Sequence, residues 1–139
     1  MAWEEKRTWL FLGGTLLTYA VYVAVVVSRQ GDGAIVDVAY GWPLLLSIVI
    51  SVVVHIVLSI LAAVVDPAQA DRRDERDDAI DQHGDLYGSY VTSGLLLVVL
   101  YAVVDKQPHF WIGNGIYLAF VVGAVVGSIV KVVRYRRGF

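Results

Sequence analysis

Long apolar runs with almost no charged side chains alternate with short polar segments along this chain. The hydrocarbon core of a bilayer is about 30 Å thick, and roughly 20 residues of helix cross it. Strands are usually about 3–10 residues long, so the length of the runs favours helices. We therefore predict an all-α membrane protein, a single domain over residues 1–139 with four transmembrane helices in two hairpins. The predicted spans are residues 8–27, 41–65, 87–104 and 110–133.

The first run follows Lys6 and Arg7, as the apolar region of a secretory signal peptide follows basic residues. Such a region has about 7–15 residues and ends in small residues at a cleavage site. The run from Thr8 to Val27 is longer and has no Ala-x-Ala-like end. We predict that it is a retained span.

The composition agrees with this fold class. Hydrophobic residues make up 58% of the 139 residues, whereas soluble domains have about 45–50% apolar residues. The formal net charge of −2 indicates neither a nucleic-acid partner nor an acidic one. The chain has no cysteine, which excludes disulfide bonds, thiolate metal ligands and cysteine redox chemistry.

The basic residues set the predicted orientation, because Lys and Arg are enriched in cytoplasmic loops. With four spans, all of the 11 Lys and Arg residues except Arg29 and Lys106 lie on one side of the membrane. We therefore predict a multi-pass protein of the plasma membrane. Its N-terminus, its C-terminus and the loop 66–86 are expected on the cytoplasmic side.

The loop 66–86 between the second and third spans is highly charged. Asp66 suits an N-cap position, Pro67 suits the first turn of a helix, and Gly84 suits a C-terminal cap. These three residues predict a short polar cytoplasmic helix over residues 67–83, separate from the third span.

Aspartates recur along this segment at steps of three and four residues, which places them on one face of a helix. They are Asp71, Asp74, Asp78, Asp81 and Asp85. Because like charges at this spacing repel each other, water, neighbouring arginines, a cation or a basic partner must offset the repulsion. Hard cations bind carboxylate oxygens, so the first four aspartates are weak candidates for metal ligands, although no EF-hand spacing is present. The alternatives are a protein partner docked at Asp74, Glu75 and Arg76, and a solvated helix without a ligand.

A polar stripe interrupts the second span at steps of four residues. It consists of Ser47, Ser51, His55 and Ser59. An ionisable residue near mid-membrane, as His55 is, costs free energy and usually faces protein or water. His55 is therefore a candidate for a proton relay, a metal site or a haem site, or it is a neutral histidine bonded to a neighbouring helix. The candidate bonding partners are Tyr19, Tyr22, Thr92 and Tyr101. Bis-histidine haem ligation needs a second intramembrane histidine, which the chain lacks, so no cofactor is expected.

The fourth span carries small residues, Ala119, Gly123 and Gly127, again at steps of four. A ridge of small residues allows two helix backbones to approach closely. The ridge predicts a helix-packing face, either within the chain or between two copies in a homodimer.

The segment Asp74-Glu75-Arg76, followed by Asp77-Asp78-Ala79-Ile80, carries a resemblance to other proteins. The chain resembles a family of small, uncharacterised prokaryotic membrane proteins with four predicted spans and an acidic Asp-Glu-Arg segment between spans two and three. The likeness in layout covers nearly the whole chain, and the motif covers about ten residues. Some members accompany small helix-turn-helix regulators, so the resemblance implies a regulatory membrane partner and no catalytic residues.

Catalytic signatures are missing from the sequence: there is no Ser-His-Asp or metalloprotease spacing and no Gly-rich phosphate loop. We therefore expect a non-enzymatic accessory or regulatory partner that acts through its cytoplasmic acidic loop. The first alternative is a small transporter or channel, in one form a dimer, with a Ser/His-lined polar path. The second is a subunit of a larger membrane complex. The expected partners are the lipid bilayer, a cytoplasmic protein and a second copy of the chain, with no direct contact to nucleic acid.

Overall fold

The computed structural model describes residues 3–65 and 75–137. Within them the chain forms α1 (Trp3–Ser28), the 3-10 turn η1 (Ile35–Asp37), α2 (Gly41–Val65), α4 (Glu75–Val104) and α5 (His109–Arg137). All four α-helices are long and apolar enough to cross a membrane. The prediction of an all-helical chain with four candidate spans is confirmed.

The helix ends follow from local chemistry. Pro43 lies in the first turn of α2, where its missing N–H is not needed for the helix. α5 begins directly after Pro108, whose carbonyl accepts a hydrogen bond from the Trp111 amide at 3.0 Å. Acidic residues occupy the first turn of α1, and arginines occupy the last turn of α5, so both complement the helix dipole.

The start of the third span differs from the prediction. α4 begins at Glu75 and runs without a break through Gly84, so the prediction that Gly84 ends a separate helix was wrong. Gly84 is buried against α5, where a Cβ atom would collide with the Lys131 side chain and lie 2.8 Å from the Gly127 carbonyl oxygen. This glycine therefore permits close helix packing and does not cap a helix. Residues 75–83 form the first turns of α4, and the remainder of the predicted cytoplasmic helix lies outside the described residues.

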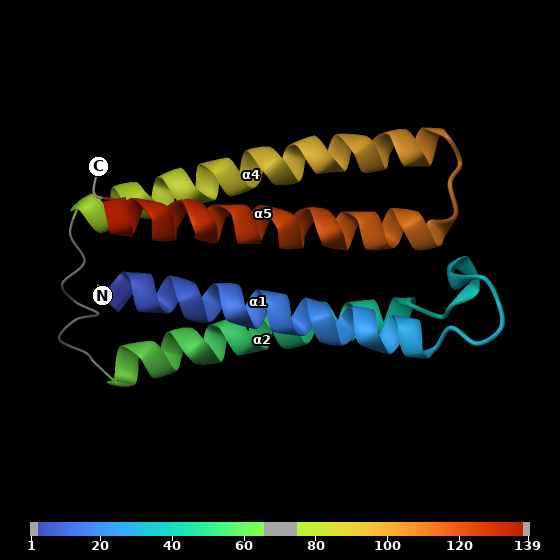
Figure 1. The fold of residues 1–139 in the computed structure, drawn as a ribbon, viewed down its shortest axis with the longest axis horizontal. Coiled ribbons are helices and arrows are strands. Elements are labelled where there is room, and N and C mark those ends of the chain that lie inside the picture. Colours follow the sequence, from blue (N-terminus) through green and yellow to red (C-terminus); the bar gives the residue numbers. More distant parts are fainter. Residues whose placement is uncertain (1–2, 66–74, 138–139) are drawn as a thin grey trace.

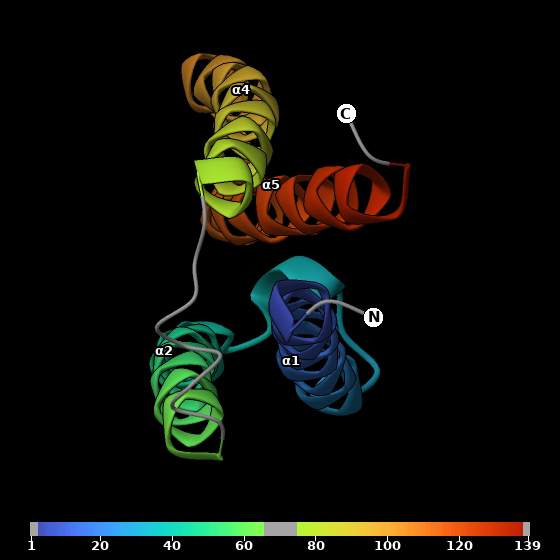
Figure 2. The ribbon, with the colours of Figure 1, turned by 90° about the vertical axis from the view of Figure 1, so that its left-hand side faces the viewer.

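The helices form two antiparallel hairpins that lie side by side (Figure 1). Both chain termini lie at one end, which we call the terminal end; residues 29–40 and 105–108 connect the helices at the other, the loop end. α4 packs on α5, α5 on α1, and α1 on α2. Viewed from the terminal end the four helices form an arc, with α2 and α4 apart at its two ends (Figure 2).

Small residues hold α4 and α5 close together. Ala119, Gly123 and Gly127 are all buried. Gly123 and Gly127 face Gly88 and Gly84 of α4, and the Ala119 carbonyl accepts a hydrogen bond from the Thr92 hydroxyl at 3.4 Å. A Cβ atom on Gly88 would lie 2.7 Å from the Gly123 carbonyl oxygen, so a larger residue there needs a wider helix separation. The small-residue ridge is thus used within the chain.

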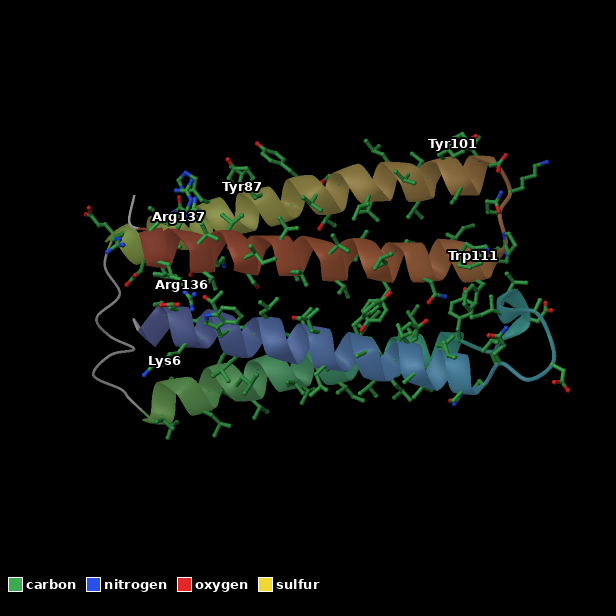
Figure 3. All side chains as sticks on the ribbon, viewed as in Figure 1. Lys6, Tyr87, Tyr101, Trp111, Arg136 and Arg137 are labelled. Carbon is green, nitrogen blue, oxygen red and sulfur yellow. The ribbon has the colours of Figure 1, made fainter. Side chains whose placement is uncertain are left out.

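The buried core lies toward the loop end. It consists of Tyr22, Val26, Phe110, Tyr117 and Val121. Elsewhere the outward helix faces carry exposed Leu, Ile and Val side chains, as expected of helices surrounded by lipid. Charged side chains gather at the two ends, with Lys6, Arg136 and Arg137 at the terminal end (Figure 3).

Candidate functional site

A cavity of about 780 Å³ lies between α1, α4 and α5, in the half of the molecule toward the terminal end. Its walls come from α1, α4 and α5, and α2 contributes only His55. Hydroxyl groups line the cavity at Thr8, Thr15, Ser89, Thr92, Ser93 and Ser128. Charged side chains line it as well: Glu4, Arg7, Asp81, Asp85 and Lys131. The volume falls within the range of about 300–1,000 Å³ that is typical of small-molecule sites.

Helical periodicity aligns these residues on one face of each helix. On α4, Asp81, Asp85, Ser89 and Ser93 follow one another at steps of four residues and all line the cavity. The two aspartates belong to the predicted acidic face, whereas Ser89 and Ser93 were not predicted as site residues. The same step of four that marked the stripe on the second span would have found them.

The charged residues of the cavity form ion pairs with one another. The Lys131 ammonium lies 2.8 Å from the Asp85 carboxylate and 3.2 Å from the Asp81 carboxylate, so it joins α5 to α4. On α1, the Arg7 guanidinium lies 3.4 Å from Glu4. Carboxylates and cationic groups thus alternate along the described part of the lining. The Asp85 side chain is 73% exposed and is the most accessible member of its pair.

A further ion pair joins α1 to α5 beside the cavity. The Glu5 side chain is 7% exposed, and its carboxylate accepts a hydrogen bond from Arg136 Nε at 2.9 Å. The Arg136 guanidinium also lies 5.8 Å from the centre of the Trp9 ring. A buried carboxylate needs such a partner, because an unpaired charge is costly to bury.

His55 lies at the cavity wall formed by α2. Its Nδ1 is 2.6 Å from the Ser51 carbonyl oxygen, which can only accept, so Nδ1 carries a proton. Nε2 lies 3.2 Å from the Thr15 hydroxyl and 3.3 Å from the Phe11 carbonyl oxygen. The imidazole stacks on the Phe11 ring, with centroids 5.0 Å apart and planes 4° from parallel. In the neutral tautomer, the Thr15 hydroxyl donates to Nε2.

The interhelical partners of His55 are therefore Thr15 and Phe11, and none of the four predicted ones. Gly14 lies at the same contact between α1 and α2, where a Cβ atom would make ordinary van der Waals contacts. A Cβ atom at Gly14 would lie 3.7 Å from Val54 and 4.0 Å from His55 Nε2.

The predicted Ser/His stripe does not line one continuous path. His55 is its only member among the cavity-lining residues. Ser51 lies 3.5 Å from His55 Nδ1, whereas Ser47 is buried and its hydroxyl is 2.6 Å from the Tyr117 hydroxyl of α5. Ser59 is half-buried on the same helix and is absent from the cavity wall.

Toward the loop end, an aromatic cluster fills the space between α1 and α5. The Tyr22 hydroxyl donates to Asn114 Oδ1 at 2.6 Å, and Asn114 Nδ2 donates to the Phe110 carbonyl at 2.8 Å. The rings of Tyr22 and Tyr117 pack edge to face at 5.1 Å, and Tyr19 lies against Tyr117 at 5.4 Å. The cavity therefore ends at this cluster and does not cross the whole length of the helices.

The described residues of the acidic segment divide between the cavity wall and the exposed first turns of α4. Asp71 and Asp74 lie outside the described residues, and Asp81 belongs to the cavity wall. Asp78, Glu75 and Arg76 are exposed in the first turns of α4. Among residues 3–65 and 75–137, no group of three His, Asp or Glu side chains is arranged to hold a metal ion.

No family model, no curated protein and no solved structure matches this chain.

Proposed function

We propose that this chain is a non-enzymatic carrier that takes a small polar or amphipathic ligand into the cavity between α1, α4 and α5. In this proposal the protein lies in the plasma membrane and the cavity opens on the cytoplasmic side, where the basic residues of the terminal end belong. The observation that carries the proposal is the combination of a hydroxyl-lined cavity with an aromatic cluster that closes the opposite half. Access from one side only is what a carrier needs.

The unsatisfied hydroxyl groups support a polar ligand. Ser89, Ser93 and Ser128 make no side-chain hydrogen bond to any other residue in the described part of the chain. A hydroxyl group without a partner costs roughly 1–3 kcal/mol when it leaves water. Water or a polar ligand in the cavity would satisfy these groups, whereas acyl chains alone would not.

Cysteine accessibility tests the proposal, because the natural chain has no cysteine and needs no background changes. We would place single cysteines by Ser93→Cys and Ser128→Cys and label them with a membrane-impermeant maleimide in inside-out and right-side-out vesicles. The matched control is Val98→Cys, on an outward face of α4 that is 65% exposed. A second control is Ser47→Cys, in the closed half.

We expect both cavity cysteines to react in inside-out vesicles, and the control cysteines to stay unlabelled on either side. If Ser93→Cys were as unreactive as Val98→Cys, the cavity would not be water-accessible and the proposal would fail. Labelling only in right-side-out vesicles would reverse the proposed orientation.

A second candidate is the accessory role of the acidic segment. Its support is the exposure of Glu75 and Arg76 at the tip of α4, where a cytoplasmic protein has access to them. A pulldown with the Glu75→Gln and Arg76→Gln variants would test it, with Asp105→Asn at the loop end as the control. The same captured proteins from all variants would contradict this role.

A further inference from the structure

A second hollow, an apolar groove of about 450 Å³, runs between α1 and α2 in the half of the molecule toward the loop end. It shares no lining residue with the cavity between α1, α4 and α5. Large apolar side chains of both helices line the groove, and each is more than half exposed: Leu17, Val21, Leu46 and Ile50. In a bilayer, the groove therefore opens toward lipid.

The length of the groove matches one leaflet of a membrane. On α1 its lining extends from Leu17 to Arg29, and on α2 from Trp42 to Val54. Each of these stretches is about 18 Å long at a rise of 1.5 Å per residue. The hydrocarbon core of a bilayer is roughly 30 Å thick, and one leaflet supplies about half of it. The groove is thus long enough for one acyl chain that begins at the loop end and ends near mid-membrane.

The hydroxyl groups inside the groove already have hydrogen-bond partners. The Thr18 hydroxyl donates to a backbone carbonyl of α1 at 2.9 Å. The Ser47 hydroxyl lies 2.6 Å from the Tyr117 hydroxyl, and the Tyr22 hydroxyl donates to Asn114 at 2.6 Å. Because these groups are satisfied within the protein, a hydrocarbon chain in the groove leaves none of them without a partner.

Arg29 is the one charged residue that lines the groove, and it lies at the loop end. Its Nη1 donates to the Ala39 carbonyl oxygen at 3.3 Å, which leaves other N–H groups of the guanidinium for a ligand. None of the carboxylates of the loop end, where every residue is described, forms an ion pair with Arg29; they include Asp32 and Asp37 of the same loop. A guanidinium binds a phosphate group through two parallel hydrogen bonds. Trp42 at the same end is 76% exposed, and an indole ring favours the headgroup level of a bilayer.

We propose that the groove binds one phospholipid of the leaflet at the loop end, with an acyl chain between α1 and α2 and its phosphate at Arg29. The phosphate is common to zwitterionic and anionic phospholipids, so the net charge of the headgroup does not enter the argument. The chain contacts both helices and holds α2 against α1, the helix on which α2 packs. This site is separate from the cavity and does not rest on the proposed carrier function.

Native mass spectrometry of the full-length protein in mild detergent tests this inference. The probes are phosphatidylcholine and a diacylglycerol with the same two acyl chains, which lacks only the phosphate-containing headgroup. The test variants are Arg29→Gln, which removes the cation, and Val21→Trp, which fills the groove. The matched controls are Lys106→Gln, at the same end of the molecule but outside the groove, and Val98→Trp, on an outward face of α4.

We expect the wild type and both control variants to retain phosphatidylcholine in preference to diacylglycerol. Arg29→Gln should weaken retention of phosphatidylcholine roughly tenfold, the loss expected for about one hydrogen bond to a charged group, and leave that of diacylglycerol unchanged. Val21→Trp should weaken retention of both lipids. Thermal unfolding without added lipid separates a loss of binding from a loss of fold in each variant.

Four results would overturn the inference. Equal retention of phosphatidylcholine by Arg29→Gln and Lys106→Gln would remove the phosphate from Arg29. Equal retention of the two lipids by the wild type would show a groove that recognises the acyl chain alone. Equal retention by Val21→Trp and Val98→Trp would place the lipid elsewhere on the protein. A dimer that Val21→Trp abolishes and Val98→Trp preserves would assign the groove to a second copy of the chain. The maleimide test of the carrier proposal concerns the other cavity, so the two proposals can fail separately.

Discussion

Replacing Gly88 with alanine is expected to push α4 and α5 apart. A Cβ atom at this position would lie 2.7 Å from the backbone carbonyl oxygen of Gly123. Ordinary contact begins near 3.4 Å, so the helices must separate by several tenths of an ångström. The obstacle is backbone and cannot rotate away, unlike the end of a flexible side chain. Inserting a methyl group into such a packed contact costs about 1–3 kcal/mol.

Gly94 provides the matched control on the same helix. A Cβ atom at Gly94 has nothing within 4 Å. Gly94→Ala therefore gains only helix propensity, about 0.5–1 kcal/mol in a helix interior. Because Gly88→Ala gains the same propensity term, the difference in stability between the two variants isolates the steric cost. We expect Gly88→Ala to be less stable than Gly94→Ala by about 1–3 kcal/mol.

The measurement is reversible unfolding in mixed micelles as the mole fraction of a denaturing detergent is raised, followed by circular dichroism. Equal unfolding midpoints for the two variants would refute the close α4–α5 packing. Moving the substitution across the interface checks the same contact, since Gly123→Ala would collide with the Thr92 side chain and lie 2.8 Å from the Gly88 carbonyl oxygen. Gly123→Ala should therefore also fall below Gly94→Ala.

Three further changes test other contacts by the same unfolding measurement. Arg136→Ala should lower the free energy of unfolding more than Glu5→Gln does, by about 1–3 kcal/mol, because it leaves a buried carboxylate unpaired. Glu5→Gln leaves only an arginine that is largely exposed. Equal losses for the two variants would contradict this asymmetry. Ser47→Ala and Tyr117→Phe should each lower the free energy of unfolding by about 1–3 kcal/mol, because the two hydroxyl groups share one buried hydrogen bond. The double variant should lose less than the sum of the two single losses. Strict additivity would show that the hydroxyl groups do not interact. Lys131→Met should lower the free energy of unfolding by no more than about 1 kcal/mol, because its ion pairs are partly exposed. A loss that stayed the same in high salt would exclude the ionic explanation.

The helices could be predicted from sequence because their signals are local. The bounds of α2 were predicted at residues 41–65 and are found there, since a glycine and Pro43 mark its start and an apolar run fills the rest. Gly84 was predicted as a helix cap because glycine occurs both at helix ends and at close contacts between helices. Its role as a cap would depend on the next few residues, whereas its actual role depends on Lys131 and Gly127, which are distant in sequence.

The cavity could be predicted only in part. A step of four residues reveals that Ser89 and Ser93 share a face with Asp81 and Asp85, and this pattern needs no structure. Which helix that face meets is a different question, because helices that are apolar all round carry no periodic signal for their neighbours. The partner of His55 was missed for this reason: Thr15 becomes its neighbour only through the packing of α1 on α2, which the sequence of either helix alone does not indicate.

The contacts between α1 and α5 limit how the cavity can change shape. At the terminal end Glu5 binds Arg136, and toward the loop end Tyr22 binds Asn114, so the two helices are tied on both sides of the cavity. α4 is in turn held to α5 by glycine packing along its first half. α2 contributes His55 alone to the cavity wall. The three helices that form most of the cavity wall are thus tied to one another, and His55 adds α2 to the wall through its bond to Thr15 of α1.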